Sequence, residues 1–478
     1  MHTSPIHTKT YLHEALADSR LREAVDKATQ TALKKRADKV EQLPWWEELR
    51  HQAHQTKKET LDHLDRYLEL FEENCQKNGI VVHWARDAEE ARTIILELMR
   101  EKQVQSVVKS KSLTTEELDL NHFLSANHIE SLETDLGEYI VQLLDQIPSH
   151  LTAPALHLTR VDVGRIFHEK LGVPYTEDPD ALLQIARARL REKFLSADMG
   201  ISGVNFAMAR EGSFCVVENE ANGFLTVGLP RIHLAVMGIE KLIPDLASLP
   251  PFLKLLPVSA TGQKATSYLH IIGGPRRAST GEGPEEVHLL LLDNGRSRIL
   301  ADGQLRETLC CIRCGACLNV CPIYQQVGGH AYGWVYMGPI GITLIPQYLG
   351  EAEGRYAPFL SSLCGACFEI CPVRINIPHH LLKLRSRVVE TGNSGWMERL
   401  AFRGFGWLAS HPRIYRIATW FPGKFQQLLP GERAFPVPGY SQKRALGRFD
   451  GRGFRNRYNS WLRKRPQPSS SQEKEARS

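Results

Sequence analysis

Eight of the ten cysteines in this chain lie within one segment of 62 residues, from Cys310 to Cys371. Cys75 and Cys215 stand alone. The first twenty residues contain neither an apolar core nor a small-residue cleavage site, so we expect no secretory signal and a cytoplasmic chain. In a reducing compartment, clustered cysteines indicate metal binding and not disulfides. The cysteine segment is therefore expected to fold around metal.

Two motifs divide this segment. The first runs from Cys311 to Pro322 as C-x2-C-x2-C-x3-C-P, and the second, from Cys364 to Pro372, repeats it without the first cysteine. This is the spacing of bacterial two-cluster ferredoxins, in which the fourth cysteine of a motif binds the other cluster. Zinc fits less well, because zinc sites combine two C-x2-C pairs and need neither a third cysteine nor a terminal C-P. We therefore predict two [4Fe–4S] clusters.

The crossed arrangement predicts two unequal sets of ligands. One set has four thiolates, whereas the other has three, with Ser361 at the register of the missing cysteine. The first cysteine set is Cys311, Cys314, Cys317 and Cys371; the second cysteine set is Cys321, Cys364 and Cys367.

Three outcomes stay open for the incomplete second set. Either Ser361 or a non-protein ligand completes a [4Fe–4S] cluster, or a [3Fe–4S] cluster forms, or Cys310 substitutes. Cys310 adjoins Cys311 and would have to turn away from the first cluster. Because a hard oxygen ligand matches a soft cluster poorly, we expect the second cluster to be labile in air.

The chain before the cysteine segment divides into two parts. Residues 1–60 alternate charged and apolar positions at helical spacing, which predicts a helical arm that docks on the body. In residues 61–300, β-rich runs alternate with helices, which predicts βαβ units and a parallel sheet covered on both faces. Residues 202–228 read as antiparallel hairpins, with turns at Glu-Gly and Ala-Asn-Gly, and residues 285–295 as a last buried strand.

Residues 301–390 form the predicted cluster domain, and residues 391–478 an aromatic and basic C-terminal region. The last 48 residues carry twelve Lys or Arg against four Asp or Glu. Such a tail suits nucleic acid, anionic lipid or an acidic partner, but we expect a solvated, partly disordered terminus. No helix-turn-helix pattern is present, so we expect no nucleic-acid binding.

Residues 394–421 are rich in aromatic residues and arginine. A peripheral membrane contact or a partner surface would suit this stretch, but we expect it to pack against the cluster domain. No run approaches 18 apolar residues, so no transmembrane helix is predicted.

Motifs for other chemistry are few. Neither a G-x-G-x-x-G after a strand nor a G-x-x-x-x-G-K-[ST] is present. Residues 109–112, Lys-Ser-Lys-Ser, follow a predicted strand, where α/β sheets bind ligands, and are weak support for an anion site. The catalytic residues of any reaction remain unassigned.

Four stretches together resemble a known family: residues 197–224, 309–324, 328–341 and 362–378. They are similar to the lactate utilization iron–sulfur proteins of bacteria, the B type, over roughly residues 60–390. The resemblance implies an α/β LUD domain, similar in fold to sugar-phosphate isomerases and CoA-transferases, followed by an α-helical ferredoxin-type 2[4Fe–4S] domain. It also implies that the seven motif cysteines are the ligands.

The resemblance further implies a role in the oxidation of L-lactate to pyruvate. The partners would be a cysteine-rich CCG-domain subunit and a second LUD-domain subunit. We expect this chain to be the electron-transfer subunit. The alternatives are a catalytic subunit that binds lactate in the LUD domain, for which the sequence offers no clear base, and an iron–sulfur regulatory protein.

Overall fold

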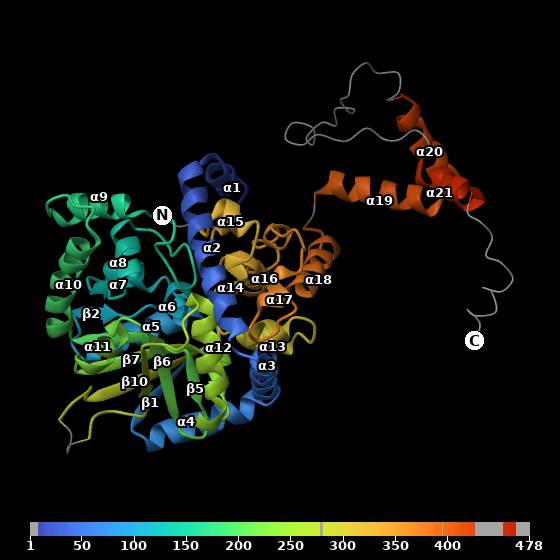
Figure 1. Ribbon diagram of the computed structural model, residues 1–478. Helices are drawn as coiled ribbons and strands as arrows, with labels where there is room; N and C mark the ends of the chain where they lie inside the picture. The colour runs from blue at the N-terminus through green and yellow to red at the C-terminus, as the bar shows by residue number, and fades with distance from the viewer. Residues whose placement is uncertain (1–7, 278–280, 394, 426–452, 465–478) are drawn as a thin grey trace. The chain divides into compact units, whose positions relative to one another are not determined.

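The computed structural model describes residues 8–277, 281–393, 395–425 and 453–464 (Figure 1). The chain divides into two compact units, residues 1–393 and 394–478. The larger unit contains both sheets and the whole cysteine segment.

A six-stranded sheet forms the centre of the larger unit, and all of its strand pairs are parallel. The predicted α/β fold with a parallel sheet is confirmed. In spatial order the strands are β1 (Ile80–Ala85), β10 (Glu286–Leu292), β7 (Ile232–Gly238), β4 (Met199–Gly203), β2 (Ser106–Lys109) and β3 (Glu130–Glu133).

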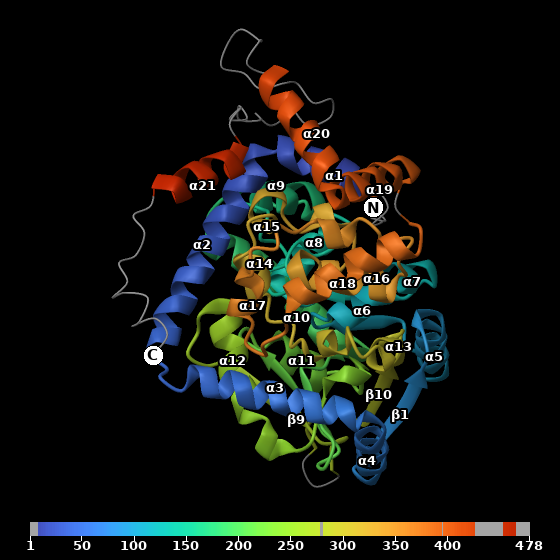
Figure 2. The ribbon, with the colours of Figure 1, turned by 90° about the vertical axis from the view of Figure 1, so that its right-hand side faces the viewer.

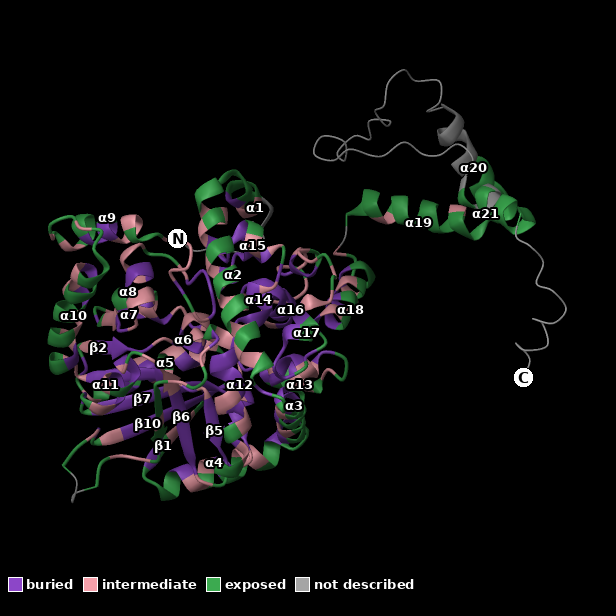
Figure 3. Ribbon diagram, in the orientation of Figure 1, coloured by how far each residue is buried: buried purple, intermediate pink, exposed green. Residues whose placement is uncertain are grey.

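Alternate residues of the central strands pack on opposite faces of this sheet. In β10, Leu290 and Leu292 join the apolar core beneath α5 (Ala88–Glu101) and α7 (Leu120–Ala126). Leu289 and Leu291 join the other core, which continues into the cysteine segment. Because both faces are covered, these strands are buried along their length (Figure 3).

A second sheet of four strands, β8 (Leu242–Ile243), β5 (Phe206–Met208), β6 (Ser213–Glu218) and β9 (Tyr268–Ile272), packs in that other core. The hairpin predicted at the Glu-Gly turn is present as β5 and β6. The β-run predicted after the Ala-Asn-Gly turn is wrong, because this stretch is α11 (Asn222–Gly228). The Glu218 carboxylate accepts the first helical N–H groups, from Gly223 and Phe224, at 2.5 and 2.8 Å.

Four helices precede the first strand: α1 (Thr8–Ala17), α2 (Ser19–Glu41), α3 (Trp46–Asp62) and α4 (Leu64–Lys77). Asp18 caps α2 by accepting the Leu21 N–H at 3.0 Å. Helices α2 and α3 both pack along α12 (Pro250–Thr261), and α2 also packs against the cysteine segment (Figure 2). These helices therefore link the sheet region to the cysteine segment.

The cysteine segment and the stretches on either side of it, residues 296–390, consist of helices joined by turns. They are α13 (Arg296–Ala301), η4 (Arg306–Cys310), α14 (Ala316–Asn319), α15 (Tyr324–Val327), η5 (His330–Tyr332), α16 (Gly338–Tyr348), η6 (Ala357–Phe359), α17 (Ala366–Ile370) and α18 (Ile377–Glu390). The remaining helices of this unit are α6 (Leu113–Glu117), α8 (Leu136–Leu143), α9 (Arg160–Leu171), α10 (Pro179–Ser196), η2 (Ile239–Lys241) and η3 (Leu246–Ser248).

The smaller unit contains α19 (Trp396–Ser410), α20 (Pro412–Phe425) and α21 (Gly453–Lys464). Large apolar side chains on α19 are exposed, including Trp396 and Phe402. The expected packing of this region on the cluster domain stays a prediction. The extreme tail, residues 469–478, lies outside the described residues. Within the described part of the chain, no helix is both long enough and apolar enough to cross a membrane.

A buried ion cluster joins the sheet region to the cysteine segment. The fully buried Arg296 lies 2.7 Å from Glu117 and 2.5 Å from Glu240, and its guanidinium stacks over the ring of Tyr348 at 5.1 Å. Burial disfavours the charged form of Arg296. The attraction of the two carboxylates outweighs this effect, so the pKa of Arg296 lies above its usual value. The pairing is therefore maintained inside the core.

Replacing Arg296 tests this cluster. Arg296→Met would leave Glu117 and Glu240 buried without their main partner, so we expect a loss of about 3–5 kcal/mol of unfolding free energy. Denaturant unfolding followed by circular dichroism measures it. The control Arg276→Met breaks an exposed pair with Glu285 and should cost no more than about 1 kcal/mol. Equal losses in the two variants would contradict the role of Arg296.

Candidate iron–sulfur site

The first motif folds as a tight loop that leads into the short helix α14. Arg313 and Gly315 both have left-handed backbone conformations, with φ of 60° and 76°. These two turns bend the chain between successive cysteines. The Arg313 N–H donates a hydrogen bond to the Cys311 sulfur at 3.4 Å.

Cys371, from the second motif, lies beside the first three cysteines of the first motif. All four members of the first cysteine set line one small cavity. Burial raises the pKa of the Cys314 thiol, and the charges of Cys371 and Cys311 raise it further. The rest of the cavity wall is mostly apolar and includes Leu151, Ile312, Ile340, Val373, Ile375 and Ile377.

The second cysteine set gathers separately. Burial raises the pKa of Cys367 to about 12, with added effects from the charges of Cys321 and Cys364. Cys321 is buried, whereas Cys364 is exposed. The structure thus brings together the same two groups of cysteines that the spacing indicated, and the second group reaches the surface.

The thiols of both sets are suited to a soft, positively charged metal centre. Burial raises the pKa of Cys371 to about 11, so at neutral pH this thiol keeps its proton unless a metal cation such as iron binds the sulfur and the proton is released to solvent. The Ile375 N–H donates a hydrogen bond to the Cys371 sulfur at 3.4 Å. Backbone donors of this kind stabilise a thiolate and tune a bound cluster. The first set, with four sulfurs and apolar walls, fits a [4Fe–4S] cluster.

Ser361 occupies the same place in its loop as Cys311 does in the first motif. The Leu363 N–H donates a hydrogen bond to the Ser361 hydroxyl oxygen at 3.1 Å, as the Arg313 N–H does to the Cys311 sulfur. Leu363 also has the left-handed conformation of Arg313, with φ of 55°. The second motif therefore keeps the geometry of a ligand loop, with an oxygen in place of the first sulfur.

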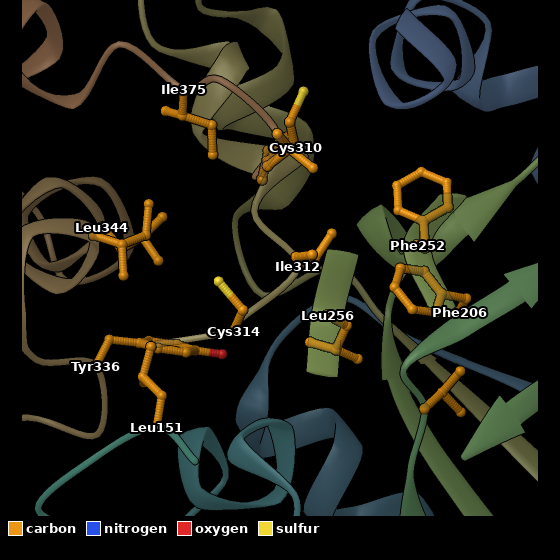
Figure 4. Close-up of a cluster of buried hydrophobic side chains, with 14 of the residues drawn as sticks. Leu151, Phe206, Phe252, Leu256, Cys310, Ile312, Cys314, Tyr336, Leu344 and Ile375 are labelled. Atoms are coloured by element: carbon orange, nitrogen blue, oxygen red, sulfur yellow. The ribbon is translucent and has the colours of Figure 1, made fainter. Parts of the chain in front are cut away.

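Cys310 stands apart from both sets. It is buried, does not line the cavity of the first set, and its sulfur points in another direction from that of Cys314 (Figure 4). Burial raises the pKa of the Cys310 thiol to about 12. This thiol packs as a small apolar side chain, and the cysteine charges that act on it are those of Cys371 and Cys311, both members of the first set.

Two arginines of the N-terminal helices hold the second motif, and sequence reasoning missed both. From α3, Arg50 donates to the carbonyl oxygens of Cys371 at 3.0 Å and Glu369 at 2.9 Å. From α2, Arg36 donates to the carbonyl of Ile370 at 3.2 Å. Charged residues on a helical arm look solvated in a sequence, so no local signal could have found these contacts.

A glycine in the segment between the motifs allows a close approach. Gly338 has φ of 67°, and a side chain there would lie 2.5 Å from Leu318 of α14. The start of α16 thus packs directly on the first motif. This glycine is needed for packing around the candidate site and for its own backbone conformation.

Family models match three consecutive parts of the chain. The LUD domain matches residues 68–292, the 4Fe-4S dicluster domain matches residues 307–375, and the C-terminal domain of lactate utilisation protein B matches residues 385–465. The dicluster match supports the binding of iron–sulfur clusters in the cysteine segment.

Similar proteins match over nearly the whole length. Lactate utilization protein B of Bacillus velezensis is 40% identical over 460 residues, 96% of each chain. An uncharacterized electron transport protein of Escherichia coli is 39% identical over 470 residues, 97% of each chain. The crystal structure of a DUF162 family protein from Deinococcus radiodurans aligns with 48% of this chain and 98% of its own, at 12% identity and a TM-score of 0.26, which is too low to bear on the fold.

The Ser361 geometry leads to a test. Ser361→Cys places a thiol where the loop already presents an oxygen, so we expect more iron to survive exposure to air than in the unaltered protein. Iron analysis and electron paramagnetic resonance (EPR) before and after air exposure measure the change. Ser362→Cys, one residue away, is the control and should have no effect. Unaltered protein that keeps about eight irons per chain in air would contradict a labile second cluster.

Proposed function

The chain belongs to the lactate utilization protein B family, and from this premise we propose that it is the iron–sulfur electron-transfer subunit of an L-lactate-oxidising system. The observation that carries the proposal is the meeting of Cys371 with the first three cysteines of the first motif, next to the second cysteine set. We assign a [4Fe–4S] cluster to the first set. To the second we assign a [4Fe–4S] cluster with Ser361 or a non-protein ligand, or a [3Fe–4S] cluster.

Both sets are largely buried, but the second set has one exposed member, which supports an outer place for the exchange of electrons. Cys314 and Cys317 of the first set are buried, whereas Cys364 of the second set is exposed. The sets are neighbours, because the charge of Cys371 acts on Cys367. When bound, the clusters would supply one-electron acceptor and donor sites. The chain then offers a buried site near the LUD domain and an outer site that a partner can approach.

Cations surround the first set and favour its more negative, reduced state. Lys57, Lys241 and Arg313 all interact electrostatically with Cys311, and each of the three is largely withdrawn from water. Positive charge at short range stabilises an added electron. We therefore expect the first cluster to be reduced at a higher potential than it would be without these side chains.

We propose two partners, a cysteine-rich CCG-domain subunit and a second LUD-domain subunit. Family resemblance supports this assembly, and the exposed second set gives one of them a place to exchange electrons. In this arrangement the site that oxidises lactate lies at least partly on a partner.

The pairing of cysteines can be tested by comparing substitutions. If Cys371 belongs to the first set, Cys371→Ala should match Cys311→Ala in iron loss and in the EPR signal that disappears. Cys321→Ala should instead match Cys364→Ala. Cys310→Ala is the matched control, since this buried thiol stands outside both sets, and it should keep all its iron. A Cys371→Ala variant that behaves like Cys364→Ala would refute the crossed assignment.

The carrier role can be tested with lactate itself. We expect L-lactate to leave the cluster absorbance of the anaerobic isolated chain unchanged, because the chain has no assigned catalytic base. Adding the two partner subunits should make the absorbance bleach. Dithionite, which reduces clusters directly, is the control for intact clusters. Bleaching of the isolated chain by lactate would contradict a carrier-only role and favour the catalytic alternative.

A further inference from the structure

A cavity of about 280 Å³ lies at the carboxyl ends of β2, β4 and β7, three neighbouring strands of the large sheet. Its lining includes Ser110 and Lys111 after β2, Asn205 after β4, and Lys241 after β7. Ligands of open α/β sheets bind at this edge, where loops after several strands meet. Its position is therefore that of a ligand site in the LUD domain.

The opposite wall of the cavity comes from the cysteine segment. Ile312 and Arg313, which lie between Cys311 and Cys314 in the first motif, both line it, together with Tyr336. One loop thus contributes its cysteines to the first set and its intervening side chains to the cavity. A molecule in the cavity would lie directly beside the first cysteine set.

Several buried polar groups on the lining lack hydrogen-bond partners. Arg313 is 8% exposed, and among the described residues none accepts a hydrogen bond from its guanidinium. Its nearest carboxylate, Glu240, is 3.5 Å away, and Tyr336 lies under it at 4.5 Å. The Ser110 hydroxyl and the Lys111 ammonium are likewise buried without a hydrogen-bond partner in the described part of the chain. Such groups are costly unless a ligand satisfies them.

The carboxylates on the lining are mostly engaged elsewhere. Glu218 accepts the N–H groups of Gly223 and Phe224, and Asp135 accepts the N–H of Glu138 at 3.1 Å. Glu220 lies at an exposed position. Among the described residues of the lining, the unsatisfied buried groups are the positively charged donors of Lys111 and Arg313, the Ser110 hydroxyl, and one acceptor, the Asn222 side-chain oxygen.

Lys109, two residues before Lys111 at the end of β2, is a buried lysine whose ammonium group is fully paired. It lies 2.5 Å from Glu133 and 3.0 Å from Glu116, and it donates to the Thr115 hydroxyl at 2.9 Å. Lys111 has only a distant pair with Glu138, at 3.6 Å. Of the Lys-Ser-Lys-Ser stretch, Lys109 is thus structural, whereas the other three residues line the cavity.

We propose that this cavity binds a small carboxylate that carries a neighbouring hydroxyl or oxo group. Lys111 and Arg313 offer positive charge for the carboxylate, and the Ser110 hydroxyl can bond the neighbouring oxygen. Val204, Leu256 and Ile312 give an apolar wall for a short alkyl group. The volume is below the usual range for drug-sized ligands, which favours a small acid. Binding rests on these side chains alone, and its link to electron transfer rests on the proposed function.

The test uses the full chain, purified without oxygen and with its iron content measured. Calorimetric titration with L-lactate, pyruvate and inorganic phosphate compares the ligands. We expect both carboxylates to bind and phosphate to bind far more weakly. Lys111→Met should weaken carboxylate binding about tenfold or more, because a charge-assisted hydrogen bond is lost. Lys111→Arg should restore most of the affinity, and Ser110→Ala should weaken binding more for L-lactate than for acetate.

Lys193→Met is the matched control, since Lys193 forms an exposed pair with Glu130 on the same domain, and it should bind like the unaltered chain. Folding of each variant is checked by circular dichroism. Unchanged affinity in folded Lys111→Met, or binding of phosphate alone, would overturn the proposal. An iron-loaded chain that binds no carboxylate would refute carboxylate binding in the cavity but not the electron-transfer function. A folded chain that binds the carboxylate but cannot hold iron would support the cavity as a ligand site and contradict the electron-transfer function.

Discussion

The position of Cys371 beside the first motif is the constraint on which the rest of the cysteine segment depends. It requires the second motif to return to the first across the intervening helices, and the backbone of residues 368–373 has to be held there. Arg50 and Arg36 hold this backbone by donating hydrogen bonds to its carbonyl oxygens, and a ring nitrogen of His54 lies 2.8 Å from the carbonyl oxygen of Val373. The N-terminal helices are thus part of the candidate iron–sulfur site.

Two opposing electrostatic effects act on the first cysteine set. Burial disfavours every charged thiolate, which is why the pKa values of its buried thiols are raised. The neighbouring cations act in the other direction, and at an effective dielectric of about 20 a unit charge 4 Å away is worth about 4 kcal/mol. Such a site is poor for free thiolates but well suited to thiolates bound to a positively charged iron–sulfur core, and the surrounding lysines and arginines balance the negative charge that remains.

Much of this architecture could be predicted from local patterns. The spacing of cysteines indicated the two groups that the structure brings together, and periodicity indicated the parallel sheet. Features that depend on distant partners could not be predicted. Residues 222–228 form a helix because Glu218 caps it, and Arg50 contacts residues more than three hundred positions away. Ser361 is an intermediate case. Its place at the position of the missing cysteine could be predicted from the spacing, but its hydrogen bond from the Leu363 N–H, which matches that of Cys311, could not.

Arg313 connects the two sites of the larger unit, because it lies between two cysteines of the first set and also lines the LUD-domain cavity. A carboxylate bound beside Arg313 would offset part of the positive charge around the first set, and this lowers the reduction potential there. By thermodynamic linkage, an electron added at the first set must weaken the binding of the carboxylate by the same factor. An oxidised product with the same charge would then leave more readily once the electron has arrived. One shared guanidinium is sufficient for this coupling, and no movement of either domain is required.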